Sequence, residues 1–381
     1  MYRNVGGACL AIMVPALFMF AGPAAAETVV RPQLTVEEKY DSNPAFGSGA
    51  SSDFATTLSP SVSVAAGSRE STFKGTYELN SVFYHKESGL DYTAQSADLE
   101  AAFTPSKGAK AVFRDTVAKT MDSLVALDAG IQTERAWILS NTAAIEFQKE
   151  ITQRGALELA LEDERMDFDS PSFVDTRSYG ASVAWRYAYS DLAALKTGYA
   201  YARYHFETDG ADDVNVHKAA VELTKRFSEG LSATLSAGFV LADGNGDGTH
   251  PDWTVDASAT KGFKGGTLSA GVSRDISHSS GLSGEISVTN RLYLRAAKGL
   301  GESSGLSLSF SLADSGSEPS GELDVTSYGA ELASYWQPRQ WVRLSGGYSR
   351  FQQWADGAVA GDLDRDQVFI KVTLMPLDWR I

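Results

Sequence analysis

The histidines are the first candidates for acid–base chemistry. Only one of them has hydroxyl neighbours, in the run His278-Ser279-Ser280, which is the one arrangement that suggests a serine nucleophile beside its base. No carboxylate stands at a spacing that would orient such a base, so a hydrolase is the weakest of the functions we consider. The other histidines fall mostly near the ends of the segments described below: His85, His205, His217 and His250.

A second candidate site is the run Asp-Gly-Asn-Gly-Asp-Gly at residues 243–248. Asp243, Asn245 and Asp247 offer oxygen ligands at alternate positions, as in the first half of an EF-hand calcium loop. The position of the bidentate glutamate is held by Thr254. The run therefore predicts either a Gly-Asp-rich turn or a weak contact with a divalent cation near lipopolysaccharide.

The third group of candidates consists of charged side chains inside regularly alternating segments. Their function depends on which surface those segments form, so the elements that carry them must be predicted first. Acidic members fall in the first half and middle of the chain, and basic members in the last third. The acidic members are Glu146, Glu158, Glu162 and Glu222, and the basic members are Arg291, Arg295, Arg343 and Lys371.

The first 26 residues have the composition of a secretory signal peptide. Arg3 gives a positive start, residues 5–20 are apolar, and residues 24–26 are three alanines that suit signal peptidase. We expect cleavage to leave residues 27–381 as one mature domain. A transmembrane anchor is the alternative, but the apolar run contains Pro15 and is shorter than the roughly 20 residues that span a membrane.

The mature chain left by this cleavage contains no cysteine, because Cys9 lies in the leader. Disulfides, thiolate metal sites and cysteine nucleophiles are therefore excluded, and we predict no cofactor. Loss of Arg3 leaves 32 basic and 48 acidic residues, a formal net charge of −16. This balance argues against a nucleic-acid partner, since phosphate binding needs clustered lysine and arginine.

From residue 29 onward, strand-length segments with period-two alternation recur roughly every twenty residues, as barrel hairpins do. No later segment is apolar enough for a membrane helix, so a mature chain that spans a membrane must form a closed β-barrel. A soluble β-sandwich also alternates, but this length would need several domains, and no composition shift divides the chain. In the clearest segment one face carries Leu231, Ala233, Leu235, Ala237, Phe239 and Leu241.

The connections and the tryptophans favour the barrel. Long acidic connections, such as residues 41–53 and 356–366, alternate with short ones, such as 67–70 and 337–340. Outer-membrane barrels segregate loops and turns in this way. Indole rings prefer the headgroup level of a membrane, and most tryptophans fall at segment ends, with Trp185 nearer a segment middle: Trp137, Trp253, Trp336, Trp341, Trp354 and Trp379.

The predicted fold is an all-β, transmembrane, antiparallel up-and-down barrel. The segments start near residues 29, 55, 71, 91, 109, 137, 155, 177, 193, 214, 231, 253, 267, 285, 305, 325, 341 and 367, which makes about 18 strands. Sixteen is the alternative, because residues 109–120 and 137–150 alternate imperfectly. The connection at residues 121–135 either folds inward as a constriction loop or remains a long surface loop.

A barrel of this width holds an aqueous channel, which favours transport over catalysis. If the apolar register faces lipid, the charged candidates line the lumen, with acidic and basic groups on different sides of the wall. We expect them either to create a transverse field that orients polar solutes or simply to solvate the pore.

Tyr40-Asp41-Ser42-Asn43, Ser52-Asp53-Phe54 and Leu58-Ser59-Pro60 resemble segments of the outer-membrane β-barrel porins that are often encoded with exopolysaccharide-export genes. The resemblance implies an export or diffusion porin of the outer membrane, in contact with lipid and lipopolysaccharide and with periplasmic polysaccharide-export proteins as partners. It carries over no catalytic or ligand residues. The alternative function is a plugged structural or assembly barrel. The last residues alternate in the opposite register, which predicts a bulge near Pro376.

Overall fold

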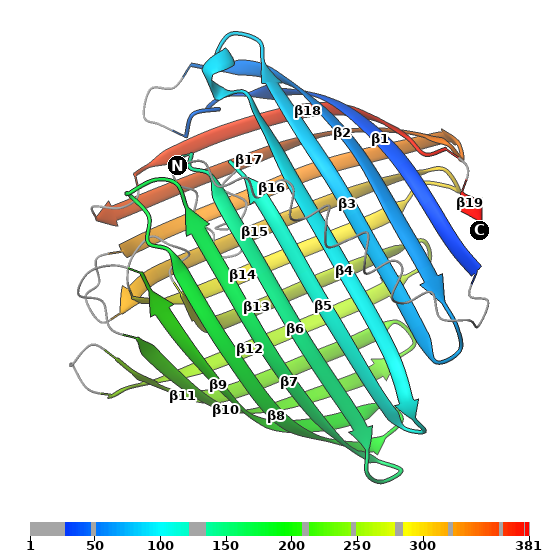
Figure 1. The fold of residues 1–381 in the computed structure, drawn as a ribbon, viewed down its shortest axis with the longest axis vertical. Helices are drawn as coiled ribbons and strands as arrows, with labels where there is room; N and C mark the ends of the chain where they lie inside the picture. Colours follow the sequence, from blue (N-terminus) through cyan, green and yellow to red (C-terminus); the bar gives the residue numbers. More distant parts are fainter. Residues whose placement is uncertain are drawn as a thin grey trace.

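In a computed structural model, 18 long antiparallel strands form one closed barrel (Figure 1). The structure describes residues 27–46, 51–121, 135–207, 213–244, 249–278, 285–318, 323–357, 361–376 and 378–380. Each strand pairs with the next along the chain, and β18 pairs with β1 to close the barrel. A two-residue strand, β19 (Trp379–Arg380), pairs with the start of β1.

The strand bounds are β1 (Glu27–Asp41), β2 (Asp53–Gly67), β3 (Ser71–Tyr84), β4 (Tyr92–Ser106), β5 (Ala109–Thr120), β6 (Ile138–Glu150), β7 (Gly155–Phe168), β8 (Thr176–Ser190), β9 (Ala193–Phe206), β10 (Val214–Ser228), β11 (Leu231–Asp243), β12 (Thr249–Phe263), β13 (Gly266–His278), β14 (Ile286–Gly299), β15 (Ser304–Glu318), β16 (Leu323–Arg339), β17 (Val342–Gly357) and β18 (Leu363–Leu374). One 3₁₀ turn, η1 (Ser88–Leu90), follows β3. Among the described residues no helix is long and apolar enough to cross a membrane.

The strand count of 18 is confirmed and the alternative of 16 is wrong. Every strand begins within four residues of its predicted start. The two imperfectly alternating segments are β5 and β6, which pair with each other from Ala109–Lys149 to Thr120–Ile138. Ladder hydrogen bonds depend on the backbone, so an irregular side-chain pattern does not prevent pairing.

The two ends of the barrel differ, as the connection lengths predicted. At one end, here called the turn end, the connections between strands are as short as residues 191–192 and no longer than 151–154. At the other, the loop end, they extend to residues 121–137. In the two-residue turn between β10 and β11, Gly230 adopts a φ of 81°, which a side chain would strain, and its carbonyl accepts a bond from the Gly262 amide.

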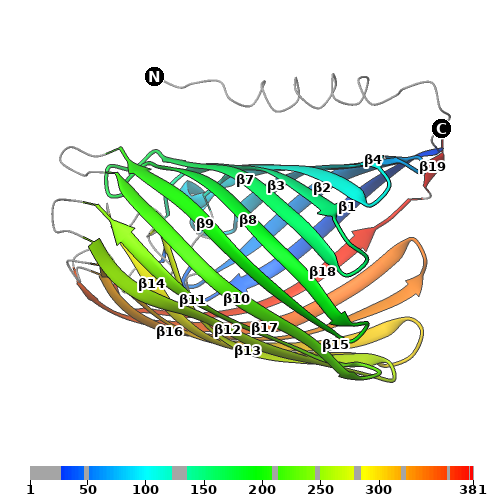
Figure 2. The same cartoon turned by 90° about the horizontal axis from the view of Figure 1, so that it is seen from below.

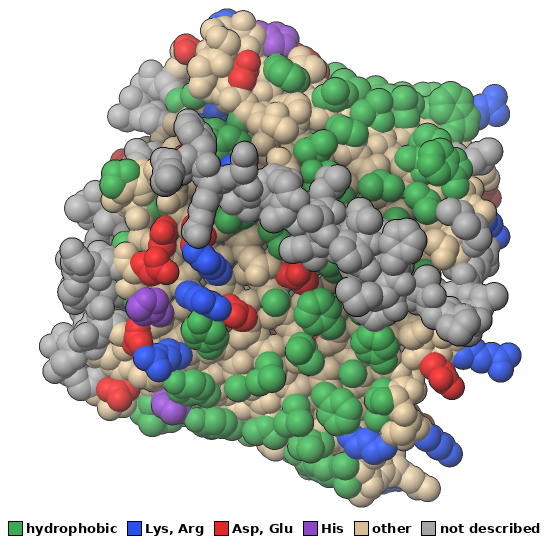
Figure 3. Space-filling model, viewed as in Figure 1, with side chains coloured by type: hydrophobic (Ala, Val, Ile, Leu, Met, Phe, Trp, Pro, Cys, Tyr) green, Lys and Arg blue, Asp and Glu red, His purple; other side chains and the backbone are tan. Residues whose placement is uncertain are grey.

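The outward register is apolar along most of the barrel. Large hydrophobic side chains such as Leu235, Leu308 and Ile370 are 52%, 43% and 66% exposed there. Figure 3 shows apolar side chains spread over one outer face, with charged side chains toward both ends of the barrel. Exposed aromatic rings lie near both ends: Trp253 and Trp354 near the loop end, and Trp336, Trp341 and Trp379 near the turn end. This is the lipid-facing belt with aromatic girdles expected of a membrane barrel.

The barrel is flattened, so that two broad walls face each other (Figure 2). Strands β2–β8 belong to one wall and β12–β17 to the other, and the walls join through β9–β11. Near Pro376 the register against β1 shifts by one residue, from Leu34–Leu374 to Val30–Trp379. The break in the last strand therefore lies where the reversed alternation predicted a bulge.

Candidate functional site: a mixed-charge recess in the lumen

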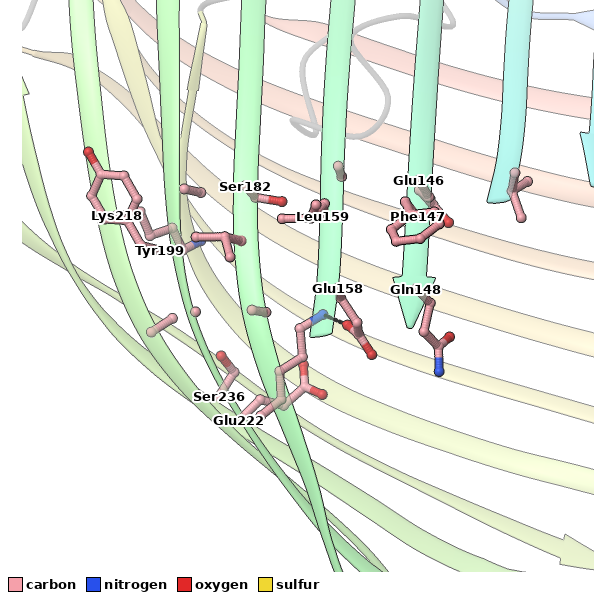
Figure 4. Close-up of a pocket in the computed structure, with 18 of the residues that line it drawn as sticks. Glu146, Phe147, Gln148, Glu158, Leu159, Ser182, Tyr199, Lys218, Glu222 and Ser236 are labelled. Atoms are coloured by element: carbon pink, nitrogen blue, oxygen red, sulfur yellow. Dashed lines mark ion pairs between the residues drawn. The ribbon is translucent and has the colours of Figure 1, made fainter. Parts of the chain in front are cut away.

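Three of the four acidic candidates line one recess on the inner wall. Glu146 on β6, Glu158 on β7 and Glu222 on β10 lie on the register opposite the exposed apolar side chains and face a cavity of about 580 Å³ (Figure 4). Glu162 lies on the same face of β7, four residues closer to the loop end than Glu158, and does not line the recess. The tertiary fold thus gathers carboxylates that are up to 76 residues apart in the chain.

These carboxylates are accompanied by cations that the sequence analysis missed. Arg114 Nη1 lies 2.5 Å from Glu146 Oε1, and Arg114 Nε lies 3.3 Å from Glu100 Oε2. Lys196 Nζ lies 2.8 Å from Glu158 Oε2. The recess is therefore a mixed-charge surface and not the acidic wall we expected. The inward register of β5 and β9 carries these cations, so the strand alternation was the signal that would have found them.

The floor of the recess is made of small side chains. Ala184, Gly198 and Ala220 line it and are consecutive partners in the register from β8 to β10, and Gly238, the partner of Ala220 on β11, continues this row of small residues beyond the recess. A Cβ on Gly198 would lie 3.0 Å from the Ala184 Cβ, and one on Gly238 would lie 2.7 Å from Thr254 Oγ1. Larger residues would fill the space where the two walls join, so these small residues create the recess.

The basic candidates lie on the other part of the barrel. Arg291 and Arg295 belong to β14, Arg343 to β17 and Lys371 to β18. The fold does not bring them to the recess, whose lining comes from β5 to β11. Lys371 Nζ lies 3.0 Å from Glu37 Oε2 across the seam between β18 and β1. A transverse field across the lumen stays a prediction, now between a basic wall and a mixed one.

Three of these cations share a packing pattern. Arg295 lies over the ring of Tyr293, Arg343 over Tyr335 and Lys371 over Phe369, at 5.4, 5.1 and 4.6 Å from the ring centroids. A Cβ on Gly271, Gly305 or Gly347 would lie within 2.7 Å of the same three rings. Each ring therefore lies between a glycine of a neighbouring strand and a cation, which holds the cation against the lumen wall.

The loop-end half of β13 parts from β12 and bends into the lumen together with β14, which stays paired with both β13 and β15. Pairing of β12 with β13 stops at Val255–Arg274, whereas β13 and β14 stay paired to His278–Ile286. Val272 is 45% exposed on the lipid side, yet Ile276, on the same face of β13, packs against the buried cluster that contains Phe206 and Val240. Residues 286–288 are all buried, so both faces of this strand end are covered.

This inward hairpin end reaches the recess. Lys218, which lines the recess from β10, places Nζ 2.9 Å from Asp275 Oδ1 on β13. Arg274 lies where β13 parts from β12 and stabilises this point. Its Nη2 lies 2.8 Å from Asp252 Oδ2, and its guanidinium lies 4.9 Å from the Trp253 ring centroid. The sequence pattern does not reveal this element, because Ile276 and Ile286 fit the lipid-facing pattern equally well.

The loop end of the lumen is closely packed, whereas the turn end is open. Inward side chains near the turn end, such as Lys110, Arg186 and Arg226, are exposed. Inward side chains near the loop end are buried around the whole barrel: Asp53, Ala55, Val82, Phe206, Val216, Val240, Ser315, Val325 and Gln353. The accessible part of the lumen therefore lies toward the turn end.

The remaining candidates gain no support as sites. Asp243 ends β11, while Asn245 and Asp247 lie outside the described residues. No three His, Cys, Asp or Glu side chains in the described ranges come together as a metal site. The backbone of His278 pairs with Ile286, and Ser279 and Ser280 lie outside the described residues, as do residues 122–134 of the proposed constriction loop and the leader.

Comparison with known proteins establishes the fold. No family model and no curated sequence matches the chain. Pseudomonas aeruginosa OccK2 (OpdF), solved in complex with glucuronate, is 13% identical, with a TM-score of 0.51 over 91% of this chain and 98% of that one. P. aeruginosa OpdK, solved with vanillate, is 12% identical, with a TM-score of 0.50 over 92% and 99%. Acinetobacter baumannii OccAB4 is 9% identical, with a TM-score of 0.50 over 93% and 99%. The chain therefore has the 18-strand barrel fold of these outer-membrane porins.

Proposed function

We propose that the chain is an outer-membrane pore for small polar solutes. The observation that carries this proposal is the charged recess of about 580 Å³ on the inner wall of a barrel whose outer register is apolar. A lumen lined by fixed charges orients polar solutes, and an apolar outer belt suits lipid. The OccK2 structure with glucuronate and the OpdK structure with vanillate support small polar molecules as the solutes of such a fold.

Saccharides are the finer version of this proposal, and an exported exopolysaccharide is the version that the family resemblance favours. Hydroxyl-rich chains form hydrogen bonds with carboxylates and guanidinium groups such as those of the recess. Export would require the packed loop end to open around an extended polymer and a periplasmic protein to deliver it. Deletion of the gene followed by measurement of surface polysaccharide tests it, and unchanged polymer would discard export.

A plugged structural barrel is the second candidate, and the packed loop end favours it. Inward side chains there are buried around the ring, including Val240 and Val325, each 1% exposed. A permanently closed lumen would give the barrel a role in assembly or in outer-membrane integrity instead of transport.

Planar-bilayer conductance of the purified barrel separates the two candidates. We expect steady channels, because a pore whose loop end opens to pass solute also conducts ions, whereas a plugged barrel would give none.

Fractionation tests the location: we expect the chain in the outer membrane, with lipopolysaccharide as its neighbour and residues 1–26 removed. A periplasmic soluble protein would overturn both candidates.

A barrel hydrolase is the third class, and we propose no catalytic role. Lipid or peptide turnover that is lost in His278→Ala would contradict this assignment.

A further inference from the structure

The charges around the recess balance each other. Four cationic side chains and three carboxylates line it. Lys218 also binds Asp275 of the inward hairpin, and Arg114 also binds Glu100, which is itself paired with Lys74, so the set holds five charges of each sign. The formal charge of this set is therefore zero, although both signs are present along the whole rim. Such a surface attracts neither anions nor cations as a class.

The opposite charges are arranged as pairs over the small-residue floor. Lys196 on β9 reaches over β8 to Glu158 on β7, above Ala184. Glu222 on β10 is the direct register partner of Lys196, and it has no ion-pair partner within 4 Å among the described residues. Lys196, Glu158 and Glu222 therefore offer both signs of charge within reach of one small molecule.

The pairs are partly removed from water. The side chain of Glu158 is 25% exposed, and those of Lys218 and Lys196 are 33% and 41% exposed. A solute with one charge that binds here takes one member of a pair and leaves the other without its partner, which is costly where solvation is reduced. A solute with both charges replaces the contacts of both members at once.

We propose that the recess is a binding site for small dipolar solutes that carry an ammonium and a carboxylate group on the same carbon. The solute carboxylate binds Lys196, and its ammonium binds Glu222, the register partner of Lys196, and Glu158, its ion-pair partner. This inference rests on the proposed function, because it names the solute class of the same pore.

Four three-carbon solutes of nearly equal size test the proposal: serine, which has both charges, glycerate, which is an anion, serinol, which is a cation, and glycerol, which is neutral. Radiolabelled uptake into proteoliposomes containing the full barrel is measured at low solute concentration. We expect serine uptake to be saturable and about tenfold faster than that of the other three, which corresponds to about 1.4 kcal/mol and is close to the net effect of one additional hydrogen bond.

Two variants locate the selectivity. Glu222→Gln removes one negative charge from the recess and Lys196→Met removes one positive charge. We expect each to abolish the advantage of serine, with glycerate favoured in the first and serinol in the second. Ser309→Ala, on the inner face of β15 outside the recess, is the matched control and should keep the advantage. A heat-modifiable band on gels verifies that each variant is folded.

The outcomes distinguish failure of the dipolar site from failure of the proposed pore. Equal uptake of all four solutes, or fastest uptake of glycerol, would overturn the dipolar site while leaving the pore intact. Fastest uptake of glycerate by the unmodified barrel would assign selectivity to the basic wall and would also overturn it. No uptake of any solute by a folded barrel would refute the pore itself.

Discussion

Arg365 on β18 binds Asp41 on β1 through a buried, two-pronged ion pair that joins the ends of the barrel. Arg365 Nη2 lies 2.6 Å from Asp41 Oδ2, and Nε lies 3.0 Å from Oδ1. The two side chains are 7% and 0% exposed, and Gln367 donates a further hydrogen bond of 2.9 Å to Asp41. The two residues are 324 positions apart, so this contact can form only when the barrel closes.

Asp41→Ala should destabilise the closed barrel strongly, because it leaves the Arg365 guanidinium buried without its carboxylate. Removal of one partner from a buried pair costs about 3–5 kcal/mol. Urea unfolding of the barrel in lipid vesicles, followed by tryptophan fluorescence, measures the effect. Glu37→Gln removes the carboxylate of the neighbouring, more exposed pair with Lys371 and should cost far less. Equal losses in the two variants would show that the buried pair does not secure the seam.

Which face of the barrel wall contacts lipid is tested by placing a charge on each side of one strand. Leu308 is 43% exposed on the outer face of β15, and Ser307, its neighbour, points into the lumen. Leu308→Arg should lower the unfolding free energy in lipid by about 2–4 kcal/mol if it lies near the bilayer midplane. Ser307→Arg should be tolerated, because the lumen solvates it. Similar losses in both variants would contradict a lipid-facing belt on β15.

Much of the fold could be predicted because barrel strands obey a simple rule. Alternation with period two, turn residues and loop lengths are local properties, and they gave the strand number and strand starts. The register shift near Pro376 was also visible, since a reversed alternation requires one additional residue.

The site could be predicted only in part, because strand neighbours across the barrel are not local. The sequence placed Glu146 and Glu158 on a polar face but did not reveal that Arg114 and Lys196 would accompany them. Nor could alternation reveal the inward hairpin. Ile276 continues the apolar register of β13, and the same pattern suits lipid outside the wall or the packed cluster inside it.

The glycines beneath the lumen aromatics give a third prediction. Gly271→Ala would place a Cβ 2.7 Å from the Tyr293 ring, so the ring must move and Arg295 with it. We expect a loss of about 1–3 kcal/mol in unfolding free energy, as for other overpacked sites. Gly271→Ala combined with Tyr293→Ala should lose less than the sum of the two single variants. Strict additivity in this double-mutant cycle would mean that ring and glycine do not pack together.

The last prediction concerns the hairpin end that folds into the lumen. Lys218 and Asp275 lie on β10 and β13, which are separated by two strands of the wall, yet their side chains meet at 2.9 Å. Cysteines at these two positions should therefore be joined by a short bismaleimide. A direct disulfide is a poorer test, because it requires closer Cα atoms than a lysine–aspartate pair.

We expect efficient cross-linking in the Lys218→Cys, Asp275→Cys variant, measured by mass spectrometry of the linked peptides from the membrane-embedded barrel. The paired control is Lys218→Cys, Glu331→Cys, since Glu331 is exposed on β16 in the facing wall and should not be reached. If the hairpin moves aside to admit solute, linkage should also lower the conductance, because it fixes Asp275 over the recess. Cross-linking of the control as fast as the test pair would mean that the hairpin end does not rest on β10, and the lumen would then be wider beside the recess.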